Sequence, residues 1–216
     1  MLKLIIFDFD GLMVNSEHVV FDALKILFKQ YGKVLTWTYF CKHIGVPVTD
    51  SLKKFHRDFE LPIPFTQFLE ERNSIVHQYL SKKLKLMPGV KKIIELLRKK
   101  PVTLAIATSG KRTYIEYWLK KFGIEKYFKT VVCIDDVQKG KPHPDLILKV
   151  LEETEFSPTE SIIIEDAPSG IEAAVKAKIR SIAIPTKGVP LQKFKNATYI
   201  LDSMADLYGL LSKLTS

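Results

Sequence analysis

Residues 2–11 read Leu2-Lys3-Leu4-Ile5-Ile6-Phe7-Asp8-Phe9-Asp10-Gly11. The apolar run is typical of a strand buried on both faces of a parallel sheet. Side chains alternate along a strand, so Asp8 and Asp10 are expected on the same side, about 6.5–7 Å apart at their Cα atoms. Gly11 lets the chain leave the sheet through a conformation that a side chain would hinder. The stretch therefore predicts two carboxylates at the carboxyl edge of a sheet, where open α/β folds bind ligands.

Two neighbouring carboxylates repel each other unless a cation joins them, and hard oxygen ligands suit Mg²⁺. We therefore expect a metal-assisted site at this edge. One carboxylate would attack the substrate and the other would transfer a proton.

The composition is that of a globular protein that needs no disulfides. The 216 residues are 46% hydrophobic and 26% charged, enough for one large domain or a domain with a substantial insertion. Cys41 and Cys133 lie in apolar surroundings and are expected as buried free thiols. No apolar run approaches the roughly 20 residues of a membrane span, and Asp8 and Asp10 interrupt the N-terminal apolar segment, unlike a signal peptide. We expect a cytoplasmic protein with no membrane partner.

The formal net charge is +9, which favours anionic partners. The lysines, however, alternate with apolar residues of predicted helices, as in residues 91–100, which is typical of a solvated helix face. No nucleic-acid motif is present. The charge indicates attraction for small phosphorylated molecules and no nucleic-acid partner.

The hydrophobic pattern divides the chain into two parts. Apolar residues recur at helical spacing over 16–31, and further helices are expected at 37–43, 49–58 and 66–81. From residue 87 onward, strands and helices alternate. Strands are expected at 102–107, 131–134, 161–164, 179–184 and 197–201, and helices at 89–100, 111–122, 143–153, 168–177 and 203–213. This predicts an α/β fold, a Rossmann-like parallel sheet flanked by helices, with an inserted all-helical block.

Three of the predicted strands end in polar groups. The strand 102–107 ends in Thr108-Ser109-Gly110, where hydroxyls and backbone N–H groups at a helix start suit an anion. An ordinary helix N-cap is the alternative for this pair.

Lys141 is held out of a helix by Pro142, and Pro144 suits the first helical turn, so the ammonium has a fixed direction. His143, between the two prolines, is expected to be a loop residue.

The strand 161–164 ends in Glu165-Asp166-Ala167-Pro168-Ser169-Gly170. Two acids after an apolar strand are costly unless they are exposed or paired with a cation. Helix capping by Asp166 is the alternative.

Together these motifs resemble the haloacid dehalogenase superfamily, in the subfamily with a helical cap that includes β-phosphoglucomutase and small-metabolite phosphatases. The chain also looks similar to pseudouridine-5′-phosphatase-type enzymes in closer details, namely Met87-Pro88-Gly89, Ala107-Thr108-Ser109-Gly110, Glu165-Asp166-Ala167-Pro168 and Ala197-Thr198. The matching pieces are Asp8-Phe9-Asp10-Gly11, Ala107-Thr108-Ser109-Gly110, Gly140-Lys141-Pro142 and Glu165-Asp166-Ala167-Pro168.

The resemblance implies a role for each motif. Asp8 would be the nucleophile that forms an aspartyl-phosphate, and Asp10 the general acid and then base. The phosphate would be bound by Gly11, Thr108, Ser109, Gly110 and Lys141. Of these, Thr108 and Lys141 would also be catalytic: Thr108 would hold the transferring phosphoryl oxygens, and Lys141 would balance charge on Asp8 and the phosphoryl group. Mg²⁺ would be held by the Asp8 carboxylate, the Asp10 carbonyl and Asp166, with Glu165 as a further ligand or as an acid that contacts the ligands.

The resemblance also implies the domains and the activity. Residues 1–14 and 83–216 would form the catalytic core and 15–82 the cap. The expected enzyme is a Mg²⁺-dependent phosphoric monoester hydrolase acting on a sugar phosphate or a nucleoside or pseudouridine monophosphate, as a monomer or weak dimer. Cap residues that would contact the substrate are Glu17, Lys42, His43 and Arg72, with exposed surface as the alternative for each.

Departures from the family pattern bear on the alternatives. The family often has Asp-Thr or Asp-Ser where this chain has Asn15-Ser16, which touches the hinge to the cap. A β-phosphoglucomutase would carry a cap histidine and a cap arginine, and the matching positions hold Val20 and Val48. Without that arginine a second phosphate has no evident partner, so hydrolysis is favoured over phosphate transfer.

Other classes fit less well. A dehalogenase lacks the second acid that Asp10 supplies. A phosphonate hydrolase needs a cap lysine, for which Lys25 and Lys29 are candidates, but usually lacks an acid at position 10. A regulatory or nucleic-acid-binding protein on the same scaffold would not need Asp8, Asp10 and Asp166 together.

Overall fold

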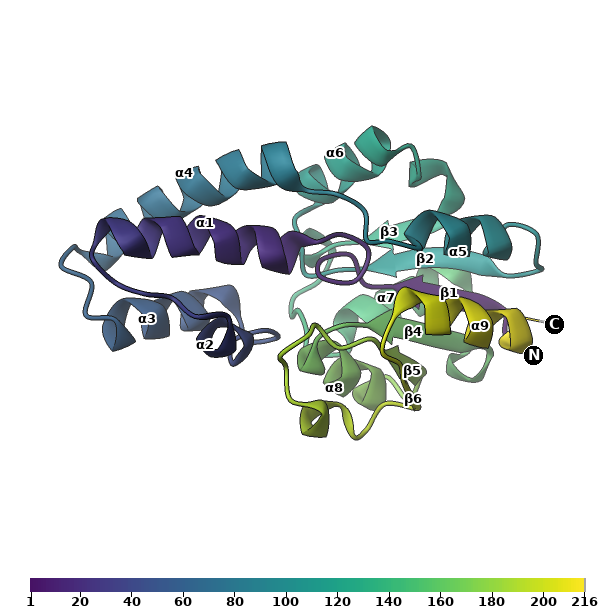
Figure 1. The fold of residues 1–216 in the computed structure, drawn as a ribbon. Coiled ribbons are helices and arrows are strands. Elements are labelled where there is room, and N and C mark those ends of the chain that lie inside the picture. The colour runs from purple at the N-terminus through teal and green to yellow at the C-terminus, as the bar shows by residue number, and fades with distance from the viewer. Residues whose placement is uncertain (216) are drawn as a thin grey trace. The chain divides into compact units, whose positions relative to one another are not determined.

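The computed structural model describes residues 1–215, which form two compact units. One unit comprises Met1–Val14 and Leu86–Ser216, and the other is Asn15–Lys85. The second unit is therefore an insertion in the chain of the first. Figure 1 shows the elements of both.

The first unit is built on a parallel sheet of six strands in the described part of the chain, in the order β3-β2-β1-β4-β5-β6. Strand β1 lies in the middle, where Leu4 pairs with Thr103 of β2 and with Ser161 of β4. All four residues of β1 are buried, as expected for a strand covered on both faces. The strand bounds are β1 Leu4–Phe7, β2 Thr103–Ala107, β3 Thr130–Val132, β4 Ser161–Glu165, β5 Arg180–Ala183 and β6 Tyr199–Ile200.

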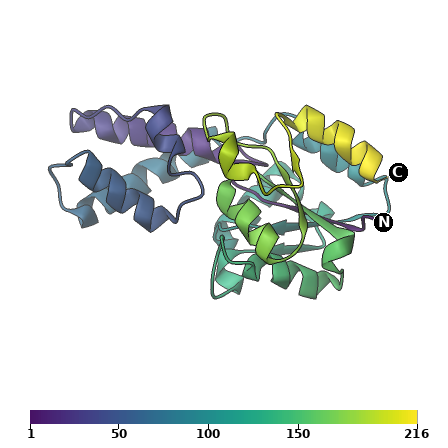
Figure 2. The same ribbon diagram turned by 90° about the horizontal axis from the view of Figure 1, so that it is seen from below.

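Helices cover both faces of this sheet. Helices α5 and α9 pack against each other on one face, whereas α7 and α8 pack on the other, as Figure 2 shows. The helix bounds are α5 Val90–Leu97, α6 Arg112–Phe122, α7 Asp145–Thr154, α8 Pro168–Lys176 and α9 Met204–Leu214. Short 3₁₀ turns are η1 Glu125–Tyr127, η2 Ile134–Asp136, η3 Pro158–Glu160 and η4 Leu191–Phe194. The predicted Rossmann-like α/β sheet is confirmed.

The second unit consists of four α-helices within the described residues. Their bounds are α1 Ser16–Gln30, α2 Trp37–Cys41, α3 Val48–Asp58 and α4 Phe65–Lys83. Helices α1 and α4 lie side by side (Figure 1). The core of this unit is aromatic: the buried Phe28 ring meets Phe55, Phe59 and Phe68 edge-on, at centroid distances of 4.7–6.2 Å. Edge-to-face pairing adds to the hydrophobic burial that stabilises the unit.

The two chain segments that join the units are paired with each other. Val14 and Leu86 form an antiparallel bridge. One residue further on, the Asn15 side-chain oxygen accepts the Lys85 N–H at 2.8 Å, and the Asn15 N–H donates to the Lys85 carbonyl at 3.1 Å. The chain therefore enters and leaves the inserted unit at residues that are paired with each other.

Several expected boundaries differ from the structure, and three of them bear on the arguments made from the sequence. Strand β1 ends at Phe7, before both acids, so the alternation argument for Asp8 and Asp10 was wrong. The strand expected at 131–134 is β3, Thr130–Val132, because the Asp136 carboxylate accepts the Cys133 N–H at 2.7 Å and turns the chain into η2. Helix α7 begins at Asp145, so Pro144 lies at the N-cap and not in the first turn.

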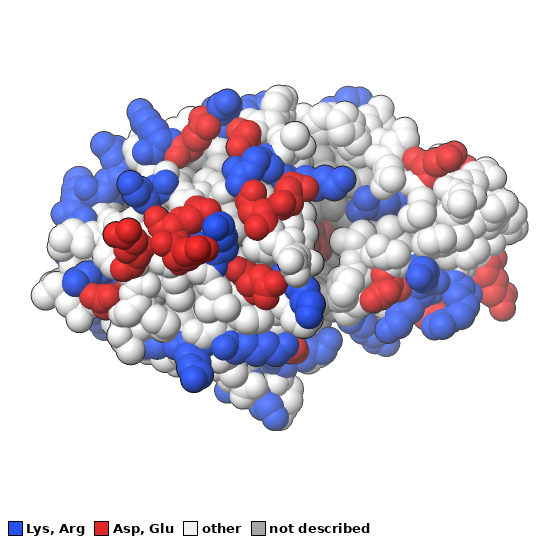
Figure 3. All heavy atoms as spheres, turned by 180° about the vertical axis from the view of Figure 1, so that it is seen from behind, with Lys and Arg blue, Asp and Glu red and all other residues white. Residues whose placement is uncertain are grey.

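The surface carries both signs of charge. Figure 3 shows Lys and Arg side chains interspersed with Asp and Glu over the visible face. No helix among residues 1–215 has the length and apolar character needed to cross a membrane.

Candidate active site

Asp8 stands at the carboxyl end of the central strand. Its backbone N–H donates to the Ile164 carbonyl at 3.0 Å, which extends the pairing of β1 and β4 by one residue. Its side chain is buried. The sheet therefore fixes the position of this carboxylate.

Lys141 is the partner of Asp8. Its ammonium lies 2.5 Å from Asp8 Oδ1 and 2.7 Å from Glu165 Oε1, and donates to the Ala107 carbonyl at 2.8 Å. Only 5% of the lysine side chain is exposed. The three contacts come from the ends of β1, β2 and β4, so Lys141 joins three neighbouring strand ends. His143, nearby in the sequence, is an exposed loop residue, as predicted.

Two glycines allow the acids that follow β4 to approach the site. A Cβ on Gly11 would lie 2.1 Å from Asp166 Oδ2, and a Cβ on Gly170 would lie 2.0 Å from Glu165 Oε2. Neither position accepts a side chain unless the carboxylate moves. Gly11 also has φ of 78°, in the left-handed region. Both acids are buried, and Asp166 Oδ2 accepts the Thr186 hydroxyl at 2.7 Å.

Burial dominates the electrostatics of this group. It raises the pKa of the Asp8 carboxyl above its ordinary value, although the Lys141 ammonium opposes the shift. Burial also raises the pKa of Glu165 to about 8, again opposed by Lys141. Burial of Lys141 disfavours its charged form, but Asp8 and Glu165 more than offset this and raise its pKa. The Lys141 ammonium thus does not fully offset the cost of burying these carboxylates.

The acidic group has the chemistry of a divalent-cation site. Asp8, Glu165 and Asp166 each offer an oxygen, and these oxygens lie within 4.8 Å of one another. If all three carboxyls are ionised, as metal binding would require, they and the Lys141 ammonium carry two formal negative charges in a buried place. Oxygen ligands and this charge fit Mg²⁺. The Glu165 oxygen that contacts Lys141 is already engaged, so its two roles compete.

The loop after β2 is arranged differently from an ordinary helix start. Thr108 is buried and its hydroxyl accepts the Gly110 N–H at 3.0 Å, whereas Ser109 is exposed. Helix α6 is capped by another segment, because Asp135 Oδ2 accepts the Arg112 N–H at 2.7 Å. The N-cap interpretation of Thr108 and Ser109 was therefore wrong. A Cβ on Gly140 would lie 3.9 Å from the Ser109 hydroxyl, which places the Lys141 loop beside this one.

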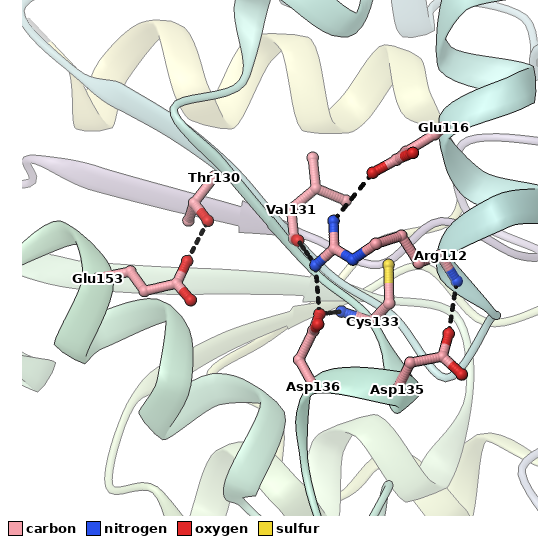
Figure 4. Close-up of polar contacts among 8 residues, drawn as sticks. All are labelled: Arg112, Glu116, Thr130, Val131, Cys133, Asp135, Asp136 and Glu153. Atoms are coloured by element: carbon pink, nitrogen blue, oxygen red, sulfur yellow. Dashed lines mark hydrogen bonds and ion pairs between the residues drawn. The ribbon is translucent and has the colours of Figure 1, made fainter.

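Arg112 braces the start of α6 (Figure 4). Its guanidinium contacts Asp136 Oδ2 at 2.5 Å, the Val131 carbonyl at 3.0 Å and Glu116 at 3.1 Å. Nearby, Thr130 and Glu153 also share a hydrogen bond. Because Arg112 joins α6 to β3 and η2, it holds the loop after β2 against the segment that leads to Lys141.

Asp10 has a partner that the sequence did not reveal. It is half-buried, and its Oδ1 accepts the Tyr114 hydroxyl of α6 at 3.0 Å. The two residues are 104 positions apart, so no local spacing could have indicated the pair. Thr186, which donates to Asp166, was missed for the same reason.

The predicted cap contacts belong to the second unit. Lys42 is exposed, with its ammonium 5.9 Å from the Tyr39 ring centre. His43 and Arg72 are half-buried, as is Glu17. The His43 ring packs edge-on against Phe55 at 4.7 Å. An exposed surface position, the alternative considered for all four, holds for Lys42 alone.

The chain matches the family model described as haloacid dehalogenase-like hydrolase over residues 5–184, and it belongs to that family. It is therefore an enzyme of the hydrolase class that the sequence motifs predicted.

Two relatives and one solved structure are similar along most of the chain. A phosphorylated carbohydrates phosphatase of Thermotoga maritima is 32% identical over 181 residues, which cover 84% of each chain. A probable pseudouridine-5′-phosphatase of Saccharomyces cerevisiae is 30% identical over 198 residues, covering 85% of this chain and 83% of the relative. The structure of a putative β-phosphoglucomutase from Thermotoga maritima is similar with a TM-score of 0.79 and 28% sequence identity. The match covers 99% of this chain and 100% of the β-phosphoglucomutase chain.

Proposed function

We propose that the protein is a Mg²⁺-dependent phosphatase that hydrolyses a small phosphorylated metabolite through an aspartyl-phosphate. The observation that carries this proposal is the buried group of Asp8, Glu165 and Asp166 around one ammonium. It combines a nucleophile, a cation site and a fixed positive charge. The names of both relatives, a carbohydrate-phosphate and a pseudouridine-phosphate enzyme, support a phosphorylated sugar or nucleoside as the substrate class.

In the first step an Asp8 oxygen forms a bond to phosphorus while the bond from phosphorus to the leaving oxygen breaks. Asp10 gives its proton to that oxygen, so the leaving group departs as an alcohol. In the second step water attacks phosphorus, its proton passes to Asp10, and the bond to Asp8 breaks. Phosphate and the original carboxylate result.

The other residues bind and orient the transferring group. The Lys141 ammonium, 2.5 Å from Asp8, reduces repulsion between the nucleophile and an anionic phosphoryl group. The Thr108 to Gly110 loop, with Gly11, would supply hydroxyl and N–H donors to the phosphoryl oxygens. A Mg²⁺ ion held by the Asp8 carboxylate, the Asp10 carbonyl and Asp166, with Glu165 beside it, would neutralise phosphate charge.

The proposed cap is the insertion, expected from the sequence at residues 15–82 and found as the unit Asn15–Lys85, and the other unit is the proposed catalytic core. In this proposal the cap contributes the contacts to the leaving group, with Glu17, Lys42, His43 and Arg72 as candidates. Closure over the site would exclude water and select the substrate.

The test is a phosphatase screen over hexose and pentose phosphates and nucleoside 5′-monophosphates, with Mg²⁺ or with EDTA. We expect Mg²⁺-dependent phosphate release that Asp8→Asn abolishes, and acid-stable ³²P labelling of the wild-type chain alone. Lys139→Met, at an exposed position two residues before Lys141, is the control for general damage.

Three results would contradict parts of the proposal. Turnover by Asp8→Asn would remove the covalent step, and equal turnover in EDTA would remove the metal. Rapid interconversion of hexose 1- and 6-phosphates would favour the mutase that the structural neighbour's name indicates.

A further inference from the structure

Helix α6 places a phenol against Asp10. Tyr114 donates its hydroxyl to Asp10 Oδ1 at 3.0 Å, and its ring meets Phe9 edge-on at 6.2 Å with an interplanar angle of 90°. The ring is therefore held by the residue that separates the two acids of the first motif. Its hydroxyl is directed to one chosen oxygen of Asp10.

The other oxygen of Asp10 faces the loop after β2. A Cβ built on Gly110 would lie 3.3 Å from Asp10 Oδ2. Gly110 belongs to the loop proposed to bind the phosphoryl group, so Oδ2 lies on the side of the proposed phosphoryl site. The two oxygens of the Asp10 carboxylate thus have different neighbours, Tyr114 at Oδ1 and Gly110 at Oδ2.

The start of α6 is held by contacts with two other segments. Two residues before Tyr114, the Arg112 side chain bonds to Asp136 and to the Val131 carbonyl, while its backbone N–H is capped by Asp135 (Figure 4). These three contacts fix the start of the helix and therefore the backbone position from which the Tyr114 side chain extends.

We propose that Tyr114 is a positioning residue for proton transfer by Asp10: its hydrogen bond to Oδ1 fixes the carboxyl so that Oδ2 meets the leaving oxygen. This inference rests on the proposed function. General acid catalysis requires the proton donor to lie within hydrogen-bond reach of the leaving atom, and a small displacement is costly in rate.

The leaving group provides a specific test. An alkoxide needs the proton from Asp10 as its bond to phosphorus breaks, whereas 4-nitrophenolate is stable enough to depart without it. The ratio kcat/KM reports the steps up to the first irreversible one, here the loss of the leaving group. A defect in positioning Asp10 will therefore appear with alkyl phosphates and not with the aryl phosphate.

The experiment compares the full-length wild type with Tyr114→Phe, which keeps the ring and its contact with Phe9. Substrates are glucose 6-phosphate, ribose 5-phosphate and uridine 5′-monophosphate as alkyl phosphates, and 4-nitrophenyl phosphate as the aryl phosphate. We expect kcat/KM to fall roughly tenfold for the alkyl phosphates that the wild type hydrolyses, and to stay within about twofold for the aryl phosphate. Tyr117→Phe, at an exposed position on the same helix, should change neither.

A second comparison shows whether Tyr114 acts through Asp10. In Asp10→Asn the added Tyr114→Phe change should have no further effect on alkyl phosphates. An equal loss on both kinds of substrate, no loss on either, or an additive loss in the double variant would overturn the inference while leaving the phosphatase proposal intact. A wild type that hydrolyses no alkyl phosphate in an Asp8-dependent way would overturn the proposed function, and this inference with it.

Discussion

Two glycines in helices of the first unit should respond in opposite ways to the same substitution. Gly209 lies inside α9, and a Cβ there would meet nothing within 4 Å. Alanine is favoured over glycine in a helix by about 0.5–1 kcal/mol, so Gly209→Ala should stabilise the fold by that amount. Gly170 lies in α8, where a Cβ would be 2.0 Å from both Cδ and Oε2 of Glu165.

The cost at Gly170 follows from what surrounds Glu165. Its carboxylate is buried and bound to Lys141 at 2.7 Å, so moving it away from a new Cβ would disturb this contact. Overpacking of this kind costs about 1–3 kcal/mol, which outweighs the gain in helix propensity. We expect Gly170→Ala to lose about 1–2 kcal/mol, so the free energies of unfolding of the two variants should differ by about 1.5–3 kcal/mol.

Urea unfolding of the wild type and both variants measures this difference, and phosphate release measures its effect on the site. Gly170→Ala should also reduce turnover, because displacement of Glu165 disturbs Lys141, whereas Gly209→Ala should keep wild-type activity. Equal stabilisation by both substitutions would refute the inferred close approach of Glu165 to α8.

Two further predictions concern the buried charges. Lys141→Met leaves the Asp8 and Glu165 carboxylates without their ammonium, and the free energy of unfolding should fall by about 3–5 kcal/mol in urea at pH 7 with EDTA. The control Lys139→Met should change it by no more than about 0.5 kcal/mol. Equal effects of the two substitutions would contradict the buried pairing. Stability in EDTA should fall as the pH rises from 4.5 to about 8, because the raised pKa of Glu165 keeps a proton on the folded state that the unfolded state has released. Glu165→Gln should flatten this slope, and a urea midpoint that rises with pH in this window would argue against the raised pKa.

Much of the fold was predictable because its signals are local. Helices α1 and α4 show apolar residues at helical spacing, and the strands of the sheet are short apolar runs between helices. The ends of elements were less predictable, since tertiary contacts set them. Asp136 ends β3 by bonding to Cys133, and Asp135 caps α6 from a different segment.

The site was predictable where motifs follow strands and unpredictable where partners come from elsewhere. Asp8, Glu165, Asp166 and Lys141 do meet, but for Asp8 the reason is the pairing of strand ends and not alternation along β1. The contact between Tyr114 and Asp10 depends on how α6 is set against the first loop. Nothing in the residues around position 114 records that distance.

The paired segments at Val14 and Leu86 have a consequence for how such a protein can change. Because the inserted helices leave and re-enter the first unit at neighbouring residues, another insert of any length could join the same two points without stretching the sheet. Selection could then exchange the inserted unit while the residues at the strand ends stayed as they were. The paired segments at Val14 and Leu86 are thus the boundary between the sheet, whose residues must be kept, and the inserted unit, which can be replaced.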